Sequence, residues 1–235
     1  MLERTNLIKK IHESKYKLVY VSSGGGTNAV SSFLKIPGAS NTVLESYIPY
    51  SKKSMDIFLN KKPDHYCSLS TCLSMSANAY KKCIQIEQDI NTKYLIGVAV
   101  TASLATTYNK IGQHKFFIAI QTESYTKSVS CILEKGKRTR EEEEELITEY
   151  VLSLIAESCG IKKALPIHDE NIEIQETQAK RSWKKLLNNK INFVSSDKST
   201  PELIFPGSFN PLHDGHLKMR ELAEKKTGMR ATFEI

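Results

Sequence analysis

The sequence predicts an α/β fold, because segments typical of buried strands alternate with segments typical of helices. The clearest strand candidates are the apolar runs KLVYVSS (residues 17–23), YLIGVAVT (94–101) and FFIAIQT (116–122). The chain has 235 residues, of which 40% are hydrophobic and 25% charged. This length and composition fit a globular chain that can bury a sizeable core.

The first third of the chain has the order helix, strand, tight turn, helix. We expect a helix over residues 3–14, then the first strand, a glycine turn and a second helix, TNAVSSFLK. Pro37 and Gly38 end that helix, because proline disfavours helical geometry in its predecessor. The segments VLESYIPY and SKKSMDIFLN then predict an extended stretch and a short helix, and a longer helix is expected around residues 70–86.

Residues 138–159 predict another strong helix, since apolar residues recur there at helical spacing. Five consecutive glutamates occupy its early turns, where the helix dipole favours negative charge. We interpret this run as a solvated helix start rather than as a metal site. No metal site is predicted elsewhere.

The chain divides by composition into three parts. Residues 1–160 predict a layered α/β domain. The polar residues 161–200 predict a linker with one short helix near Trp183. A new unit of strand, turn and helix is expected over residues 201–235.

Charge and cysteine content restrict the function classes. The formal charge of +7 favours phosphorylated partners but does not distinguish nucleic acid from nucleotides. No nucleic-acid-binding motif or basic and aromatic cluster is found, so we expect no nucleic-acid partner. No apolar run could span a bilayer and no targeting signal opens the chain, which predicts a cytoplasmic protein with no membrane partner. The five cysteines lack CxxC spacing, so we expect reduced and mostly buried thiols. A homo-oligomer remains open.

The stretch PGSFNPLHDGHLKM (206–219) carries the sharpest chemistry. A short strand over residues 203–205 precedes it, and a helix is expected to begin at HDGH. A helix N-terminus binds phosphate through its free amides, and Gly207 allows close approach of the backbone. His213 and His216 lie on one helical face, with Gly215 between them leaving room for a phosphate chain. Their imidazoles could stabilise charge that develops on phosphates.

This stretch resembles the first signature of the HxGH nucleotidyltransferases, which include cytidylyltransferases and nicotinamide or nicotinate mononucleotide adenylyltransferases. The resemblance implies that Gly207, Ser208, Phe209, His213 and His216 bind the phosphates of ATP or CTP, with both histidines catalytic and with Mg²⁺ on the phosphates. Asn210 stands where the family often has aspartate. The resemblance to these transferases further implies a Rossmann-like domain with a second signature roughly a hundred residues later. Since nothing matches that signature, residues 201–235 are expected to be the N-terminal part of a truncated transferase domain.

The longer N-terminal part resembles the C-terminal domain of CinA over about residues 5–160. The resemblance rests on SSGGGTNAVSSFLKIPGAS, VLESYIPYSKK, IGVAVTASLA and KFFIAIQT in this order. Some members are nicotinamide-nucleotide amidases, whose serine is activated by a tyrosine and a lysine in a Y-S-x-x-x-K stretch. The serine and tyrosine positions fall on Ser23 and Tyr50, and the lysine position falls on Met55, which cannot take a proton. The glycine-containing turn T-G-x-A-G-P is TASLAT (101–106) here, so a vestigial amidase site is expected.

Three functions follow as hypotheses. The favoured one is adenylyl transfer from ATP to nicotinamide or nicotinate mononucleotide, a phosphorylated acceptor, in NAD biosynthesis. The second is an amidase that uses Ser23 and Tyr50. The third is a non-catalytic nucleotide-binding module.

Overall fold

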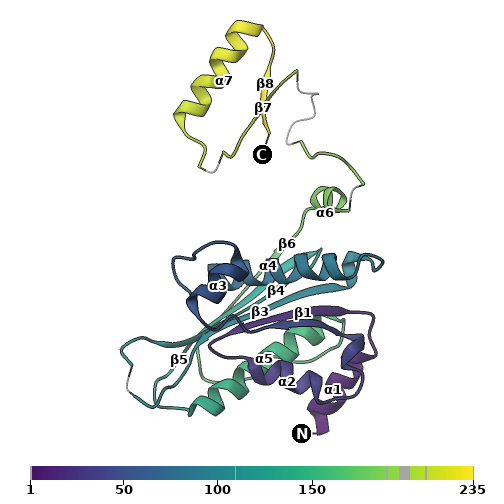
Figure 1. Ribbon diagram of the computed structural model, residues 1–235, viewed down its shortest axis with the longest axis vertical. Helices are drawn as coiled ribbons and strands as arrows, with labels where there is room; N and C mark the ends of the chain where they lie inside the picture. Colours follow the sequence, from purple (N-terminus) through teal and green to yellow (C-terminus); the bar gives the residue numbers. More distant parts are fainter. Residues whose placement is uncertain (1, 109, 189, 196–201, 210, 235) are drawn as a thin grey trace. The chain divides into compact units, whose positions relative to one another are not determined.

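The computed structural model describes residues 2–108, 110–188, 190–195, 202–209 and 211–234. These residues divide into two compact units, residues 1–188 and residues 189–235, and each is described by itself (Figure 1). None of the helices in the described ranges is long and apolar enough to cross a membrane.

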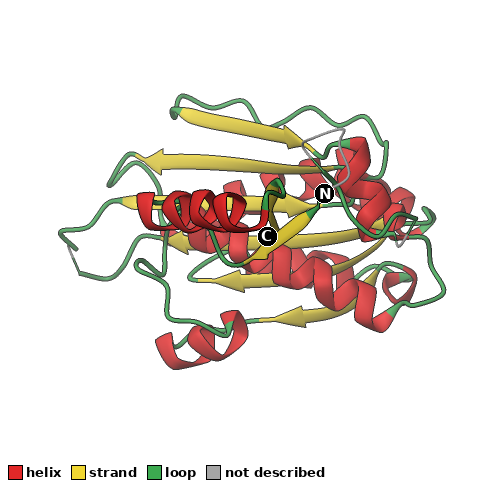
Figure 2. Cartoon of the chain, turned by 90° about the horizontal axis from the view of Figure 1, so that it is seen from above, coloured by secondary structure: helices red, strands yellow, loops and turns green. Residues whose placement is uncertain are grey.

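The first unit is built on a six-stranded sheet with the strand order β2-β1-β3-β4-β5-β6. Figure 2 shows strands of the chain lying side by side, with helices above and below them. β1 runs parallel to both of its neighbours, and the remaining pairs are antiparallel. The strands are β1 (Lys17–Ser23), β2 (Val43–Tyr47), β3 (Leu95–Ser103), β4 (His114–Gln121), β5 (Tyr125–Leu133) and β6 (Ile172–Gln178).

Helices cover both faces of this sheet and give the unit three layers (Figure 1). α1 (Leu2–His12), α2 (Thr27–Leu34) and α5 (Arg140–Ser158) pack on one face, and α3 (Lys52–Leu59) and α4 (Leu69–Ile86) pack on the other. Short 3₁₀ turns, η1 (Ala39–Asn41) and η2 (Thr92–Tyr94), precede β2 and β3. The predicted layered α/β fold is confirmed.

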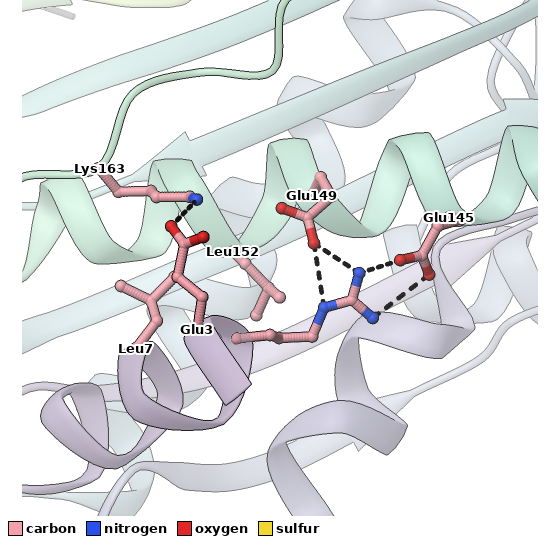
Figure 3. A pocket seen from close by; sticks show the side chains of 7 residues that line it. Glu3, Leu7, Glu145, Glu149, Leu152 and Lys163 are labelled. Atoms are coloured by element: carbon pink, nitrogen blue, oxygen red, sulfur yellow. Dashed lines mark hydrogen bonds and ion pairs between the residues drawn. The ribbon is translucent and has the colours of Figure 1, made fainter. Parts of the chain in front are cut away.

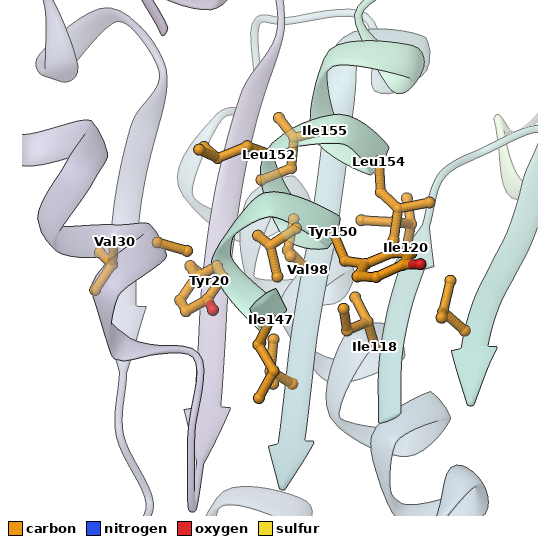
Figure 4. Packing of buried hydrophobic residues seen from close by; sticks show 14 of the residues in the cluster. Tyr20, Val30, Val98, Ile118, Ile120, Ile147, Tyr150, Leu152, Leu154 and Ile155 are labelled. Carbon is orange, nitrogen blue, oxygen red and sulfur yellow. The ribbon is translucent and has the colours of Figure 1, made fainter. Parts of the chain in front are cut away.

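Each face of the sheet has its own apolar core, as the alternation of side chains along a strand requires. In β1, Leu18 and Tyr20 face the layer of α1, α2 and α5, whereas Val19 and Val21 face α3 and α4. Figure 4 shows the first core, in which side chains of α5 such as Tyr150 point toward the strand residues. β3 is buried on both faces along eight of its nine residues, which explains why its sequence is one continuous apolar run.

The glutamate run at the start of α5 departs from the predicted solvated helix start. A capping box does form there, because the Thr139 hydroxyl accepts the Glu142 N–H (3.2 Å) and the Glu142 carboxylate accepts the Thr139 N–H (2.8 Å). Glu143, however, is completely buried. The prediction is therefore wrong for this residue, because its carboxylate has partners in other elements.

Residues 161–200 also differ from the predicted linker. Residues 172–178 form β6, which pairs antiparallel with β5 at the edge of the sheet. The short helix expected near Trp183 is α6 (Arg181–Leu187). Composition alone hides β6, since an edge strand is held by main-chain hydrogen bonds and most of its side chains are exposed.

In its described residues, the second unit consists of one strand–helix–strand motif. β7 (Leu203–Pro206) and β8 (Ala231–Glu234) pair in parallel, and α7 (Asp214–Thr227) connects them. Parallel neighbours require such a crossover connection, and this β-α-β arrangement is the building block of Rossmann-like sheets. Three aromatic rings, Phe205, Phe209 and Phe233, pack together beside the paired strands, with centroids 4.5–5.6 Å apart.

Candidate functional site

The HDGH segment lies at the start of α7. His213 is the N-cap residue in an extended conformation, and its carbonyl accepts the His216 N–H at 2.9 Å. The two imidazoles stack with their centroids 3.7 Å apart and their planes at 23°. Gly215 permits this arrangement, because a Cβ atom there would lie 3.0 Å from Cε1 of His213. Any larger residue would displace the His213 ring.

The loop after β7 supports the second histidine. The Phe209 ring meets the His216 ring edge-on, with centroids 5.0 Å apart, and also packs on Phe233. Gly207 is needed for this packing, since a Cβ at that position would approach the Phe209 ring to 2.8 Å. Ser208 is exposed on the same loop, and Asn210 lies outside the described residues. The structure thus gathers the loop residues and both histidines at one helix N-terminus.

A main-chain contact sets the tautomer of His216. Its Nδ1 accepts a long hydrogen bond from the His213 N–H, at 3.4 Å. An accepting Nδ1 leaves the ring proton of the neutral imidazole on Nε2. The second histidine therefore offers an N–H donor on the ring edge away from its own backbone contact.

In the first unit, the residues expected to form a vestigial amidase site do not assemble a nucleophile and a base. Ser23 ends β1, and its hydroxyl donates to the carbonyl of Pro49 at 3.1 Å, which cannot take the proton. Tyr50 is 68% exposed. Met55 is 1% exposed and belongs to the apolar core under α3. At the position of the family's lysine, the chain therefore has a buried methionine that packs in the core and cannot accept a proton.

Ser23 nevertheless lies where α/β sheets commonly bind ligands. The chain leaves β1 toward α2 on one face and leaves β2 toward α3 on the opposite face. Ligands tend to bind outside the carboxyl ends of two strands whose connections diverge in this way. The hydrogen bond from Ser23 to the Pro49 carbonyl links the end of β1 to the segment that follows β2.

The glycine turn that follows Ser23 is already occupied by a carboxylate of the protein itself. Glu144 of α5 accepts hydrogen bonds from the amides of Gly26 (2.7 Å) and Asn28 (3.1 Å) and from the Thr27 hydroxyl (3.0 Å). These groups form the N-terminus of α2, a location that favours anions. Sequence reasoning missed this contact, because nothing in a run of five glutamates singles out the fourth.

The charged cluster around Arg4 does not form a candidate site. The cavity of about 270 Å³ between α1 and α5 is lined by charged side chains that pair with one another (Figure 3). Arg4 binds both Glu149 and Glu145, and Lys163 binds Glu3. The described part of the chain contains no group of three or more His, Cys, Asp or Glu side chains placed to hold a metal ion.

The five cysteines are unpaired, and Cys72, Cys83 and Cys131 are buried. Burial raises the pKa of the Cys83 and Cys131 thiols to about 12, so both are protonated near neutral pH. This agrees with the prediction of reduced and mostly buried thiols.

Comparisons with known proteins bear on the fold of the first unit. No protein-family model and no curated protein matches the sequence. Among solved structures, the chain is similar to the competence/damage-inducible protein CihA from Agrobacterium tumefaciens, with 14% identity and a TM-score of 0.52 over 66% of this chain and 95% of that one. A competence-damaged protein (CinA) superfamily protein from Enterobacter cloacae gives 13% identity and a TM-score of 0.54 over 66% and 92%. A competence or damage-inducible protein from Enterobacter asburiae gives 13% and 0.53 over 66% and 98%.

These similarities establish that the fold is CinA-like. At such low identities they concern the fold alone, and function must be argued from the sites.

Proposed function

We propose that this chain is a nucleotidyltransferase-type protein, whose second unit binds the triphosphate of ATP or CTP at the start of α7. The observation that carries the proposal is the stacked pair His213 and His216 at the N-terminus of a helix between two parallel strands. A helix start with two imidazoles and a glycine between them combines amide donors, a positive dipole end and two ring donors.

In the proposed reaction, an oxygen of a phosphorylated acceptor attacks the α-phosphorus of the nucleotide, and pyrophosphate leaves. The protein contributes positioning and charge stabilisation rather than a covalent intermediate. Nε2–H of His216 would donate to an oxygen of the triphosphate, and His213 would contact the neighbouring phosphate. Gly207 and Ser208 would bring the loop backbone against the nucleotide.

The divalent ion that usually accompanies such a reaction would bind together with the nucleotide, as part of the substrate. Because the described residues contain no acidic cluster suited to a metal, Mg²⁺ would arrive with the nucleotide phosphates. The favoured acceptor is nicotinamide or nicotinate mononucleotide, which would place the reaction in NAD biosynthesis. This choice rests on the two resemblances of the sequence, since both families include proteins that act on nicotinamide nucleotides.

A second candidate function is hydrolysis of a nicotinamide nucleotide at Ser23. The CinA-like fold and the location of Ser23 at the carboxyl end of β1 favour it. The hydrogen bond from Ser23 to a carbonyl oxygen and the burial of Met55 weigh against it. A nucleotide-binding module without catalysis is the third candidate.

Nucleotide binding is the first test, because it does not require the complete catalytic reaction. We expect ATP or CTP with Mg²⁺ to bind the full chain in a calorimetric titration. His216→Ala should weaken binding by about tenfold or more, as expected for loss of one hydrogen bond to a charged group. His65→Ala, which removes an exposed imidazole from the first unit, is the matched control and should leave binding unchanged.

Product analysis separates the candidate functions. Incubation with ATP or CTP and with either mononucleotide should release pyrophosphate and form a dinucleotide. Release of ammonia that is lost in Ser23→Ala would favour the amidase instead. If the nucleotide binds equally well to the His216→Ala variant, the assignment of this motif is wrong.

A further inference from the structure

The outer side of β6 is an open edge of the six-stranded sheet. β6 pairs with β5 in an unbroken antiparallel register, and no strand in the described part of the chain pairs with its other side. Six of its seven residues are exposed, and Ile172 is half-buried. The main-chain groups on this edge are therefore accessible to another strand.

The pairing with β5 decides which main-chain groups of β6 point outward. The Ala179 N–H donates to the Ser124 carbonyl at 2.7 Å, one residue beyond the ladder, so these two residues form a hydrogen-bonded pair. Hydrogen-bonded and non-hydrogen-bonded pairs alternate along an antiparallel ladder. Every second residue before Ala179 therefore bonds to β5 in the same way. The residues between them direct their N–H and C=O groups away from β5, and these are Ile172, Ile174, Glu176 and Gln178.

β6 lacks most of the features that keep an exposed edge from pairing. Edge strands are commonly very short, bulged, or interrupted by proline or lysine. β6 has the sequence IEIQETQ, without proline or lysine, and its register with β5 has no shift. Its two acids already have partners in the same chain, since Glu176 lies 3.3 Å from Nζ of Lys127 and Glu173 accepts the Gln175 side-chain amide at 2.6 Å. Their charges therefore protect this edge less than unpaired carboxylates would.

We propose that β6 pairs with β6 of a second copy of this chain, antiparallel and about a two-fold axis at Gln175. The two copies then overlap along all seven residues of the strand. The outward-facing residues of one copy meet those of the other, which is the condition for hydrogen-bonded pairs. These pairs are Ile174 with Glu176 and Ile172 with Gln178. Each outward amide thereby meets a carbonyl of the second copy, as in recognition by strand addition.

The side chains of β6 are complementary in this register. Glu173 faces Thr177 of the second copy, whose hydroxyl can donate to the carboxylate. Gln175 faces Gln175, and each amide can both donate and accept. No two like charges lie directly opposite each other. The Glu176 side chains of the two copies are diagonal neighbours, and each is held by Lys127 of its own copy.

Other registers and the other edge of the sheet fit a second copy less well. A two-fold axis at Ile174 or at Glu176 would shorten the paired segment, and the axis at Glu176 would place two carboxylates opposite each other. The same pairing about the middle of β2 would place Glu45 opposite Glu45. Pairing through β6 uses the same edge in both copies, so assembly stops at a dimer.

Sedimentation equilibrium of the full chain without nucleotide tests this proposal. We expect a reversible equilibrium of monomer and dimer between the micromolar range and about 0.2 mM, because strand addition buries less surface than an obligate interface. A monomer at every concentration, or assemblies larger than a dimer, would overturn the proposal. The expected dimer does not depend on α7, so failure of the proposed transferase function would leave this test intact.

Opposite charges at one exposed position test the register. Thr177→Lys places an ammonium group opposite Glu173 of the second copy and should tighten the dimer, whereas Thr177→Glu places a carboxylate there and should weaken it. Each change acts twice across the two-fold axis, so we expect the dissociation constant to shift by about fivefold in each direction. Thermal unfolding should be nearly unchanged in both variants, because the side chain at this position is exposed.

Ser46→Lys and Ser46→Glu are the matched controls, since Ser46 is exposed on β2 at the other edge of the sheet. They make the same changes in net charge and should shift the dissociation constant less than about twofold. The proposal is overturned if both Thr177 variants shift association in the same direction, or if the Ser46 variants shift it as much as the Thr177 variants do.

Discussion

The carboxylate of Glu144 offers a quantitative test of how the first unit is held together. Glu144→Ala removes three hydrogen bonds that tie α5 to the glycine turn and to the start of α2. Each bond to a charged group contributes about 1.5–3 kcal/mol when buried. Because Glu144 is half-exposed, water replaces part of this loss, and removal of a helix-capping acceptor costs about 0.5–2 kcal/mol. We therefore expect destabilisation of about 2 kcal/mol.

This loss should lower the Tm by about 4–8 °C for a unit of this size, measured by thermal unfolding with circular dichroism. Glu141→Ala is the matched control, since it removes an exposed glutamate from the same helix turn and should change stability by less than about 0.5 kcal/mol. Glu144→Gln keeps only one accepting oxygen and should fall between the two. If Glu144→Ala and Glu141→Ala unfold at the same temperature, the carboxylate does not hold the turn.

Two further perturbations have equally definite outcomes. Gly24 and Gly136 share a φ of +79°, but a Cβ at Gly24 would lie 2.0 Å from the Ala102 carbonyl oxygen, whereas nothing lies within 4 Å at Gly136. In urea denaturation, Gly136→Ala should lower the free energy of unfolding by about 1–2 kcal/mol through backbone strain, and Gly24→Ala should lower it clearly more. Equal losses for the two variants would contradict the close contact at Gly24. Burial lowers the pKa of His12 below its ordinary value of 6.5. The stabilising contribution of the neutral His12 side chain is therefore complete above pH 6.5 and is lost as the pH falls through the lowered pKa. The pH dependence of urea unfolding should therefore weaken in His12→Gln but not in His65→Gln, an exposed control.

The strands that could be predicted are those whose side chains are buried on both faces. β3 reads as one apolar run because helices cover it on both sides. β5 was not predicted, because polar residues interrupt its sequence and only part of it is buried. β6 was not predicted either, since its place in the sheet depends on main-chain pairing with β5 rather than on its own composition. Burial on both faces leaves a pattern in the sequence, whereas pairing at an edge does not.

The two candidate sites differ in the same way. The residues at α7 are close in sequence, so that a local pattern of strand, turn and helix places them together. In the first unit the decisive contacts join α5 to elements far earlier in the chain, such as Glu144 to Gly26 and Glu143 to His114. Consecutive residues of a helix point about 100° apart. The five glutamates therefore face different elements, although the sequence presents them as one uniform run.

The chain thus contains two strand–turn–helix motifs with glycine in the turn, and they differ in what their helix can still bind. At α2 the amides of the first turn are satisfied by Glu144, so an added phosphate would have to displace a carboxylate held by three hydrogen bonds. At α7 no carboxylate among the described residues accepts the amides of the helix start; the His216 ring accepts the His213 N–H at 3.4 Å, and Asp214 lies in the first turn. The free energy of binding an anion includes displacement of any group already present. For this reason we expect a nucleoside triphosphate to bind at α7 rather than at α2. The two helix starts also differ in their backbone, because the N-cap Gly26 is in the left-handed conformation and the N-cap His213 is extended.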